Sequence, residues 1–163
     1  MTEPIVTGLL WFAAIGCGLM AGLYFAFSAF IMTALRLIGP AAGAAAMNSI
    51  NSAILRSPFM PLFLGSSLAA LLLAAVGLLR WGLPGSAEML AGGSLYVAGM
   101  FIVTMLFNVP LNNALASADP TSAPGSEAWD HYLRRWSAWN HVRTLASTGA
   151  LALFIAAIAR TSA

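Results

Sequence analysis

Charge is almost missing from this sequence. Only 7% of its 163 residues are charged, lysine is absent, and 60% are hydrophobic. A soluble domain of this size needs a far more polar surface, so the composition predicts an integral membrane protein. The arginines are scattered, without the basic runs or basic–aromatic interleaving of nucleic-acid-binding proteins, so a nucleic acid is not expected as a partner.

Metal-binding and catalytic motifs are equally scarce. The single cysteine, Cys17, cannot form an internal disulfide, and no His-x-x-x-His, Glu-x-x-His or Cys-x-x-Cys spacing occurs. His131 and His141 are ten residues apart, which places them off a common helical face. Phosphate-binding loops and nucleotide fingerprints are absent too. No metal or organic cofactor is therefore expected, although the eight methionines leave a haem held by histidine and methionine open.

What the sequence does contain is long apolar runs. Four of them are long enough to cross a bilayer as helices, over about 7–37, 58–81, 87–109 and 138–160. Thr2, Glu3 and Pro4 precede the first run without the positive flank of a signal peptide, so we expect it to be retained. Residues 1–163 are thus predicted to form one all-α membrane domain, a bundle of four transmembrane helices.

Between the first two spans the pattern predicts a short amphipathic helix. Gly39-Pro40 breaks the first span, and 41–56 is too short and polar to cross a bilayer. An apolar stripe at helical spacing runs along it, formed by Met47, Ile50, Asn51, Ile54 and Leu55. Asn51 lies within the stripe and is expected to point inward. Asn48, Ser52 and Arg56 are expected on another face.

Prolines and turn-forming residues determine where the third and fourth spans bend, begin and end. Pro110 predicts that the third helix continues, bent, toward Leu115, after which "ADPTSAPG" (118–125) forms a turn-rich loop. Ser126 then opens a helical extension that leads into the fourth span. Within the first span, Gly18-x-x-x-Gly22 predicts a surface that another helix approaches closely.

Four spans place both termini on one side of the membrane and the first and third loops on the other. Those two loops carry most of the arginines: Arg36, Arg56, Arg134, Arg135 and Arg143. The positive-inside rule therefore predicts that they face the cytoplasm, across a bacterial inner membrane.

Polar side chains gather at the end of the predicted bundle that carries the first and third loops, the loop end. Trp136, Asn140 and Arg143 share one helical face, and Asn108 and Asn112 are i, i+4. Tyr24 and Ser28 form another i, i+4 pair on the first span. Polar groups inside a membrane are costly, so a cluster of them indicates a site. Structural alternatives stay open, since asparagines repair the helix break at Pro110 and tryptophans form interfacial belts.

Two motifs carry a resemblance to a known family. "FNVPLNNAL" contains Asn108-x-Pro110-x-Asn112, and "WDHYLRRWSAWNHVRTLAS" contains Trp136-x-x-x-Asn140-x-x-Arg143. Together with "AAMNSINSAILRSPFMPLFLG", where a Gln often stands at the position of Asn48, they resemble the small four-helix membrane proteins that include the anthrone oxygenases. This resemblance covers nearly the whole chain. It implies O₂-dependent oxidation of an anthrone to an anthraquinone, without an obligatory organic cofactor.

The resemblance and the residue chemistry together assign roles at the site. Asn108, Asn140 and Arg143 are expected to stabilise an oxyanion or peroxide, with Asn51 and Asn112 as further polar contacts. Trp136, Tyr24 and Phe27 are expected to stack on a flat hydrophobic substrate. His141 is the expected base, with His131 second. Loss of a methylene proton would leave an enolate that reduces O₂, the co-substrate, directly.

Two other function classes stay open. A non-enzymatic membrane protein would use the same cluster of polar side chains to bind a lipid, a quinone or a partner subunit, and would need no base. A redox protein that holds a haem or a metal is the third class. The sequence also leaves open a homo-oligomer.

Overall fold

Helices make up most of the part of the chain that the structure describes. The computed structural model describes residues 3–119 and 121–161, and these contain no strand. The first long helix comprises α1 (Glu3–Ala26), a π-helical turn η1 (Phe27–Ile31) and α2 (Met32–Leu37). The shorter α3 (Pro40–Ile54) follows, and α4 (Phe59–Leu79) runs back along the bundle.

The second half of the chain repeats this pattern of a segmented helix followed by a long one. α5 (Ser86–Tyr96), η2 (Val97–Ile102), η3 (Thr104–Asn108) and α6 (Val109–Ser117) make one helix that contains two π-helical segments. α7 (Ala123–Thr161) closes the fold. The third helix thus extends past Pro110 as predicted, and it ends at Ser117, two residues beyond Leu115.

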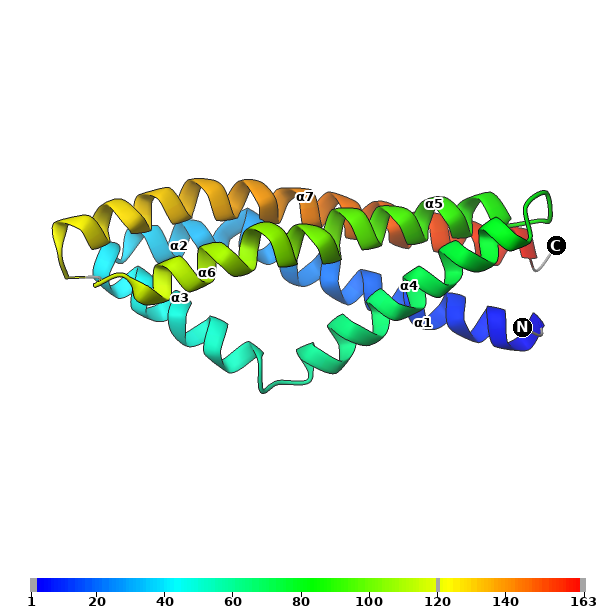
Figure 1. Cartoon of the computed structure of the whole chain (residues 1–163), viewed down its shortest axis with the longest axis horizontal. Helices are drawn as coiled ribbons and strands as arrows, with labels where there is room; N and C mark the ends of the chain where they lie inside the picture. The colour runs from blue at the N-terminus through cyan, green and yellow to red at the C-terminus, as the bar shows by residue number, and fades with distance from the viewer. Residues whose placement is uncertain (1–2, 120, 162–163) are drawn as a thin grey trace.

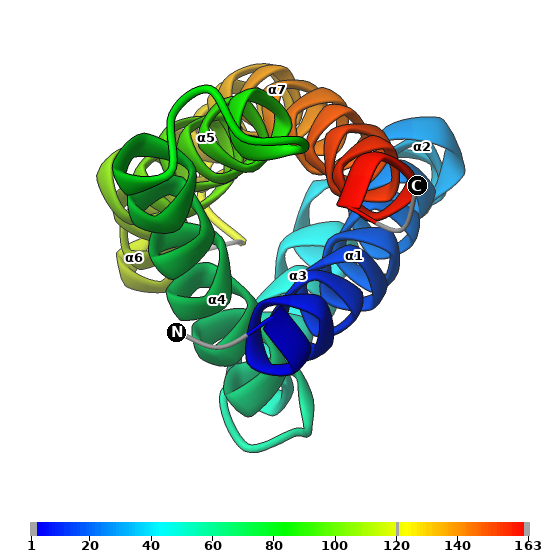
Figure 2. The same ribbon diagram turned by 90° about the vertical axis from the view of Figure 1, so that its right-hand side faces the viewer.

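Four of these helices are long and apolar enough to cross a membrane: Glu3–Leu37, Phe59–Leu79, Ser86–Ser117 and Ala123–Thr161. The predicted all-α bundle of four such helices, with a short helix in the first loop and an extension before the fourth span, is confirmed. Viewed from the end at which the termini lie, α1, α4, α5 and α7 surround the long axis (Figure 2).

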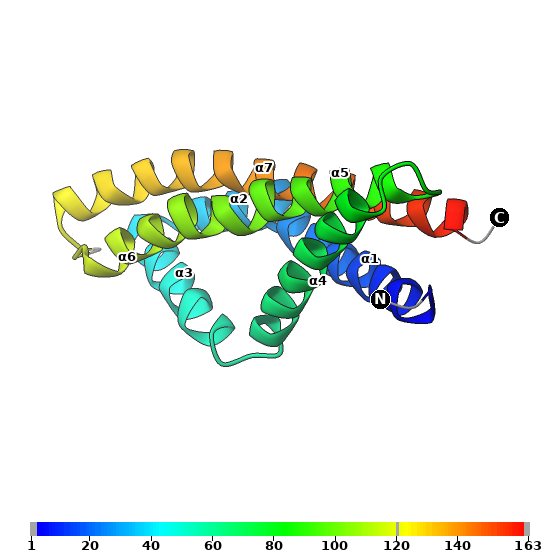
Figure 3. The same cartoon turned by 45° about the vertical axis from the view of Figure 1, so that its right-hand side comes forward.

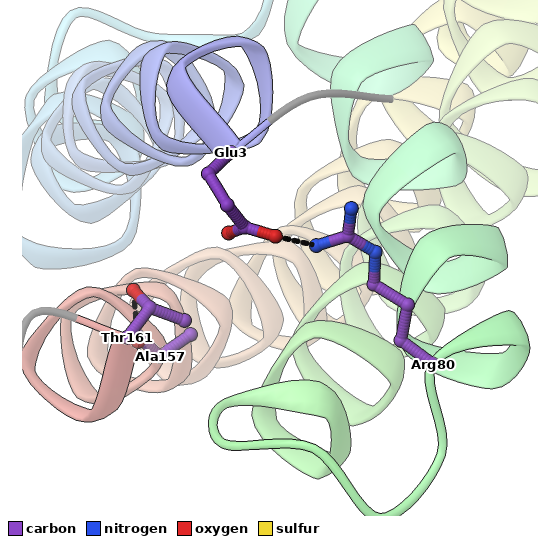
Figure 4. A network of polar contacts seen from close by, with 4 residues as sticks. All are labelled: Glu3, Arg80, Ala157 and Thr161. Atoms are coloured by element: carbon purple, nitrogen blue, oxygen red, sulfur yellow. Dashed lines mark hydrogen bonds and ion pairs between the residues drawn. The ribbon is translucent and has the colours of Figure 1, made fainter.

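Both termini lie at the same end of the molecule, opposite α3 and the loop between α6 and α7 (Figure 1). At the terminal end, Glu3 accepts a hydrogen bond from Arg80 over 2.6 Å, which ties α1 to the end of α4 (Figure 4). Arg160 pairs with Glu88 at 2.8 Å. At the opposite end, the backbone N–H and hydroxyl of Thr121 donate to Asp119, and these bonds lower the pKa of its carboxyl group.

Close helix packing depends on glycines other than the predicted pair. A Cβ on Gly16 would lie 2.8 Å from Cβ of Ser66 on α4, so α1 and α4 require glycine there. Gly22 has no atom within 4 Å of such a Cβ, and Gly18 has only an ordinary contact with Leu151. The close approach predicted for Gly18-x-x-x-Gly22 is therefore wrong, because small residues permit contact only on a face that meets another helix.

Two apolar cores lie one after the other along the bundle. The larger one packs α1, α4, α5 and α7 together at the terminal end. The smaller one joins η1, α2, α3, α6 and the first half of α7, and includes Trp129, Tyr132 and Trp136. Trp129 is only 1% exposed, so it is a core residue and not part of an interfacial belt. Between the two cores lies a layer of polar side chains.

Candidate binding and active site

A cavity of about 460 Å³ opens beside this polar layer. α3 and α4 diverge from their connecting turn as the two arms of a V, seen most clearly in Figure 3. Residues of both arms line the cavity together with residues of α1, η1, η3, α6 and α7. Cavities of about 300–1,000 Å³ hold drug-sized ligands, so the space is large enough for a ligand with several fused rings.

Most of the cavity wall is apolar. Leu23, Phe27, Phe59, Met60 and Phe63 contribute side chains from the first span and from α4. The polar lining residues come from all sides and are Tyr24, Asn48, Asn51, Ser52, Thr104, Asn112, Asn113, Trp136 and Arg143. A mainly apolar cavity with a few convergent polar groups is typical of a binding site for a hydrophobic small molecule.

Arg143 is the only charged residue in this lining. Its side chain is only 5% exposed, and its guanidinium carbon lies 4.3 Å from the ring centre of Tyr24 and 5.0 Å from that of Trp136. The ion pairs found among residues 3–119 and 121–161 join other arginines to Glu3 and Glu88. The guanidinium is therefore stabilised by aromatic faces and neutral acceptors, with no carboxylate beside it in that part of the chain.

Asn140 holds this guanidinium in place. Its Oδ1 accepts a hydrogen bond from Nη2 of Arg143 over 2.8 Å. Its Nδ2 donates to the backbone carbonyl of Tyr24 and to the hydroxyl of Ser28, both over 2.8 Å. Asn140 is fully buried and does not line the cavity. Its position therefore suits orienting Arg143 better than contacting a ligand.

The π-helical η3 supplies the other side of the polar layer. Thr104 accepts a hydrogen bond from Nη1 of Arg143 over 3.4 Å while its own hydroxyl donates to the carbonyl of Met100. Asn108 is buried and donates from Nδ2 to the carbonyl of Trp136 over 3.3 Å. Single π-helical turns are frequent at functional sites. Here one such turn brings Thr104 and Asn108 against α7.

Stacked rings continue from Arg143 along α7. Trp136 packs against Phe27 with ring centres 5.4 Å apart and against Tyr132 at 5.9 Å. The hydroxyl of Tyr132 donates to Oδ1 of Asn112 over 2.8 Å. Nε1 of Trp136 is buried and has no hydrogen-bond partner among the described residues. The rings thus form a packed wall on the α7 side of the cavity.

The predicted site residues fall into three groups by position. Six line the cavity: Tyr24, Phe27, Asn51, Asn112, Trp136 and Arg143. Asn108 and Asn140 are buried behind it and bond to α7 and α1. His141, the expected base, is exposed and lies outside the lining, with Nδ1 2.9 Å from the hydroxyl of Ser28. His131 is exposed as well.

Sequence reasoning missed several lining residues. Asn48 was expected on another face of α3, yet it lines the cavity beside Asn51. The two residues are i, i+3, a spacing that places them on one helical face. This spacing could have identified Asn48 as a lining residue from the sequence. Asn113 also lies at the cavity, and the helix continues beyond it to Ser117.

The described residues contain no group of three or more His, Cys, Asp or Glu side chains that could hold a metal ion. Both histidines of the chain are exposed. The polar atoms at the cavity are instead carboxamides, hydroxyls, an indole and the guanidinium, which bind oxygen-bearing organic groups.

Comparison with known proteins gives one match. The sequence model of the family described as Anthrone oxygenase matches residues 47–153, which is more than half of the chain. The matched segment begins in α3 at the edge of the cavity and contains Asn51, Asn112, Trp136 and Arg143. No curated protein and no solved structure matches the chain.

Proposed function

This chain belongs to the anthrone oxygenase family, and we propose that it oxidises the activated methylene of a hydrophobic aromatic ketone to a carbonyl with O₂. The proposed substrate class is a fused-ring ketone whose methylene lies between two aromatic rings. The volume and apolar wall of the cavity, together with the stacked rings of Trp136 and Phe27, support a flat aromatic ligand.

The observation that carries the proposal is the buried cation. Arg143 has no carboxylate among its described neighbours, and its Nε has no hydrogen-bond partner there. A buried charge without a counter-charge is costly. A ligand that becomes an anion in the cavity supplies that counter-charge. The enolate of an aromatic ketone fits, because its oxygen accepts hydrogen bonds and its rings pack against the apolar wall.

The proposed reaction follows from this placement. The methylene loses a proton, and Arg143 stabilises the enolate oxygen. The enolate passes one electron to O₂, and the resulting carbon radical and superoxide combine into a peroxide at the methylene carbon. Protonation of the peroxide, loss of the remaining C–H proton and cleavage of the O–O bond yield the ketone and one molecule of water. The ligand loses two hydrogens and gains one oxygen, so O₂ is the only oxidant required.

The proton acceptor in this scheme is water and not a side chain. No His, Asp or Glu belongs to the lining of the cavity. A neighbouring cation lowers the pKa of an acid by stabilising its anion, so Arg143 itself makes the bound methylene more acidic.

His141→Ala tests this assignment against the alternative that His141 is the base. Because His141 lies outside the cavity, the rate of oxygen uptake should stay within about threefold of the wild type, whereas loss of a general base costs about 10²–10⁴-fold. The measurement is oxygen consumption with an anthrone, and His131→Ala is the matched control. A hundredfold loss confined to His141→Ala would restore it as the base.

A quinone-binding protein is the second candidate. The same guanidinium would donate to a quinone carbonyl, and the absence of an ordinary base from the lining suits binding without proton abstraction. The two candidates differ in oxygen consumption. Purified protein in detergent, mixed with emodin anthrone and no added cofactor, should consume one O₂ per anthrone faster than protein-free buffer. A rate equal to that of buffer, together with tight binding of a quinone, would favour the second candidate.

We also propose that the loop end faces the cytoplasm of a bacterial inner membrane. Arg36 on α2, Arg134 and Arg135 in the first half of α7, and Arg56 in the turn between α3 and α4 are all exposed, and α2 and the start of α7 lie at this end (Figure 1). The arginines of the terminal end, Arg80 and Arg160, are paired with acidic residues, which reduces the positive charge there. The asymmetry supports the positive-inside orientation.

A further inference from the structure

The outer face of α7 is divided into two parts by its exposed ionisable residues. These residues occur along the first half of the helix up to His141 and again at Arg160. Between them, residues 142–159 contain one charged residue, Arg143, which is buried. At 1.5 Å per residue, His141 and Arg160 are about 29 Å apart, close to the hydrocarbon thickness of a bilayer. The two residues thus mark the two boundaries of the hydrocarbon region.

Aromatic rings lie at both of these levels. Trp81 is exposed and follows Arg80 at the terminal end. On the loop side, Trp139 is two residues from His141 and stacks on Phe107 with ring centres 3.8 Å apart. Tryptophan is enriched where a membrane meets water. The aromatic residues therefore support the same boundaries as the ionisable ones.

The charged part of the cavity lies just inside the loop-side boundary. Arg143 is two residues from His141 on the side of Arg160, and Thr104 bonds to its guanidinium from η3. Met105 follows Thr104 in η3, lines the cavity and is exposed. Met105 is therefore placed at the level where the outer face of the protein meets acyl chains.

The first turn of α4 lies at or inside the same boundary. From Arg80 to Phe59 the helix is about 32 Å long at 1.5 Å per residue. It slants away from the long axis of the molecule (Figure 1), so it covers less than this length across the membrane. Phe59 and Met60, which line the cavity from α4, are thus within reach of lipid.

Exposed lining residues mark where the cavity opens. They are Ser52, Leu55, Met105, Asn113 and Ala116. They belong to α3, to the residue that follows it, to η3 and to α6, which with α4 surround the opening (Figure 1). Asn113 is eight residues beyond Met105, about 12 Å farther toward the loop end. The opening therefore has an apolar side at Leu55 and Met105 and a polar side at Ser52 and Asn113.

Tight packing closes the loop end of the cavity. Ala44 and Met47 of α3 belong to one buried core with Leu115 and Trp129. A Cβ on Gly43 would fall 2.7 Å from the indole of Trp129, so α3 lies directly on α7 there. A flat ligand cannot pass between these helices without separating them.

We propose that the opening faces the bilayer and that the cavity takes its ligand from the lipid, through the apolar side between Leu55 and Met105. The inference rests on the proposed function for the kind of ligand, an aromatic ketone that dissolves in lipid. Its rings stay in an apolar medium throughout entry. Its oxygen arrives at the level of Arg143, just inside the membrane boundary.

Met105→Trp tests the entry path, because the larger indole narrows the apolar side of the opening. The measurement is stopped-flow quenching of tryptophan fluorescence by 9,10-anthraquinone, with the protein in phospholipid nanodiscs. The association and dissociation rate constants should both fall about tenfold and their ratio should stay the same, since a narrower entrance raises the barrier without changing the free or bound state. An unchanged association rate constant would overturn the entry path.

Two further variants accompany this measurement. Leu106→Trp is the matched control, because Leu106 is the next residue, is exposed and does not line the cavity. It should bind the probe at wild-type rates. Asn113→Trp narrows the polar side and should slow binding less than Met105→Trp does. If Asn113→Trp slows binding more, the ligand enters from water and the proposal is wrong.

A photoreactive residue tests the position of the opening without any ligand. p-Benzoylphenylalanine in place of Leu55 should form a phospholipid adduct on illumination in nanodiscs, detected by the mass of the intact protein. The same residue in place of Leu145, exposed within the apolar half of α7, should form the adduct too, and in place of Arg134 it should not. An adduct at Leu145 without one at Leu55 would place the opening in water.

The outcomes separate this inference from the proposed function. An adduct at Leu55 in a protein that takes up no oxygen with an anthrone overturns the proposed function and leaves the opening in the membrane. Oxygen uptake by a protein without an adduct at Leu55 overturns the entry from lipid and leaves the proposed function.

Discussion

Replacing Arg143 by methionine should lower the rate of oxygen uptake with an anthrone by about 10²–10³-fold, the usual cost of removing a donor that stabilises a developing oxyanion. Methionine keeps much of the side-chain volume and leaves the rings of Tyr24 and Trp136 packed. The substitution removes the positive charge that stabilises the enolate oxygen. The rate of oxygen uptake by Arg143→Lys should fall between those of the wild type and Arg143→Met. An ammonium group keeps the charge but lacks the planar fork that bonds to Asn140 and Thr104.

The matched control for this variant is Arg135→Met. Arg135 lies on the same helix, is exposed and does not line the cavity. It should oxidise the anthrone at the wild-type rate. Thermal melts of all three variants show whether the fold is intact. If folded Arg143→Met retained a rate within a few fold of the wild type, the buried cation would have no part in the chemistry.

Gly77→Leu should abolish the stable fold. A Cβ on Gly77 would lie 2.5 Å from the carbonyl oxygen of Ser86 and 2.6 Å from the backbone nitrogen of Leu90. Backbone atoms cannot move aside as a flexible side chain does, so α4 and α5 would have to separate. Overpacking of a tight core costs about 1–3 kcal/mol even for smaller insertions, and a whole leucine side chain should exceed this. Monodisperse protein after detergent extraction and its melting temperature are the measurements.

Gly22→Leu is the control, because no atom lies within 4 Å of a Cβ at Gly22. Leucine is also a better helix former than glycine by about 0.5–1 kcal/mol. This variant should therefore melt at or slightly above the wild-type temperature. Equal melting temperatures for the two leucine variants would show that the α4–α5 contact is looser than described.

The fold follows from the sequence because its signals are local. Apolar length defines the four long helices, and Gly39-Pro40 and the turn-rich residues 118–125 mark turns between them, although α7 begins at Ala123, three residues before the predicted start at Ser126. The inward face of α7 follows from helical spacing alone: Trp129, Trp136, Asn140 and Arg143 are all buried. The same spacing explains why His141 is exposed and lies outside the cavity. It is one residue from Asn140 and hence about 100° around the helix, which turns it outward.

The predictions that failed concern residues whose contacts are determined by a neighbouring helix. Asn108 and Asn112 are i, i+4, but the buried Asn108 packs against α7 while Asn112, one turn further, lies at the cavity, and this difference depends on the neighbouring helices. Whether a glycine lies at a helix contact depends on the neighbouring helix, which no local pattern contains. The role of Asn48 depends on how far α3 diverges from α7, a tertiary property set by its contacts with Trp129 and its neighbours.

The most direct test of the central claim is the absorption spectrum of an anthrone mixed with the protein at neutral pH under anaerobic conditions. If Arg143 stabilises the enolate, the wild type should convert a stoichiometric amount of the ligand into the enolate form, with its long-wavelength band, and Arg143→Met should not. Admission of O₂ should then remove the band as the anthraquinone forms. A ligand that binds the wild type entirely in its ketone form would contradict the account.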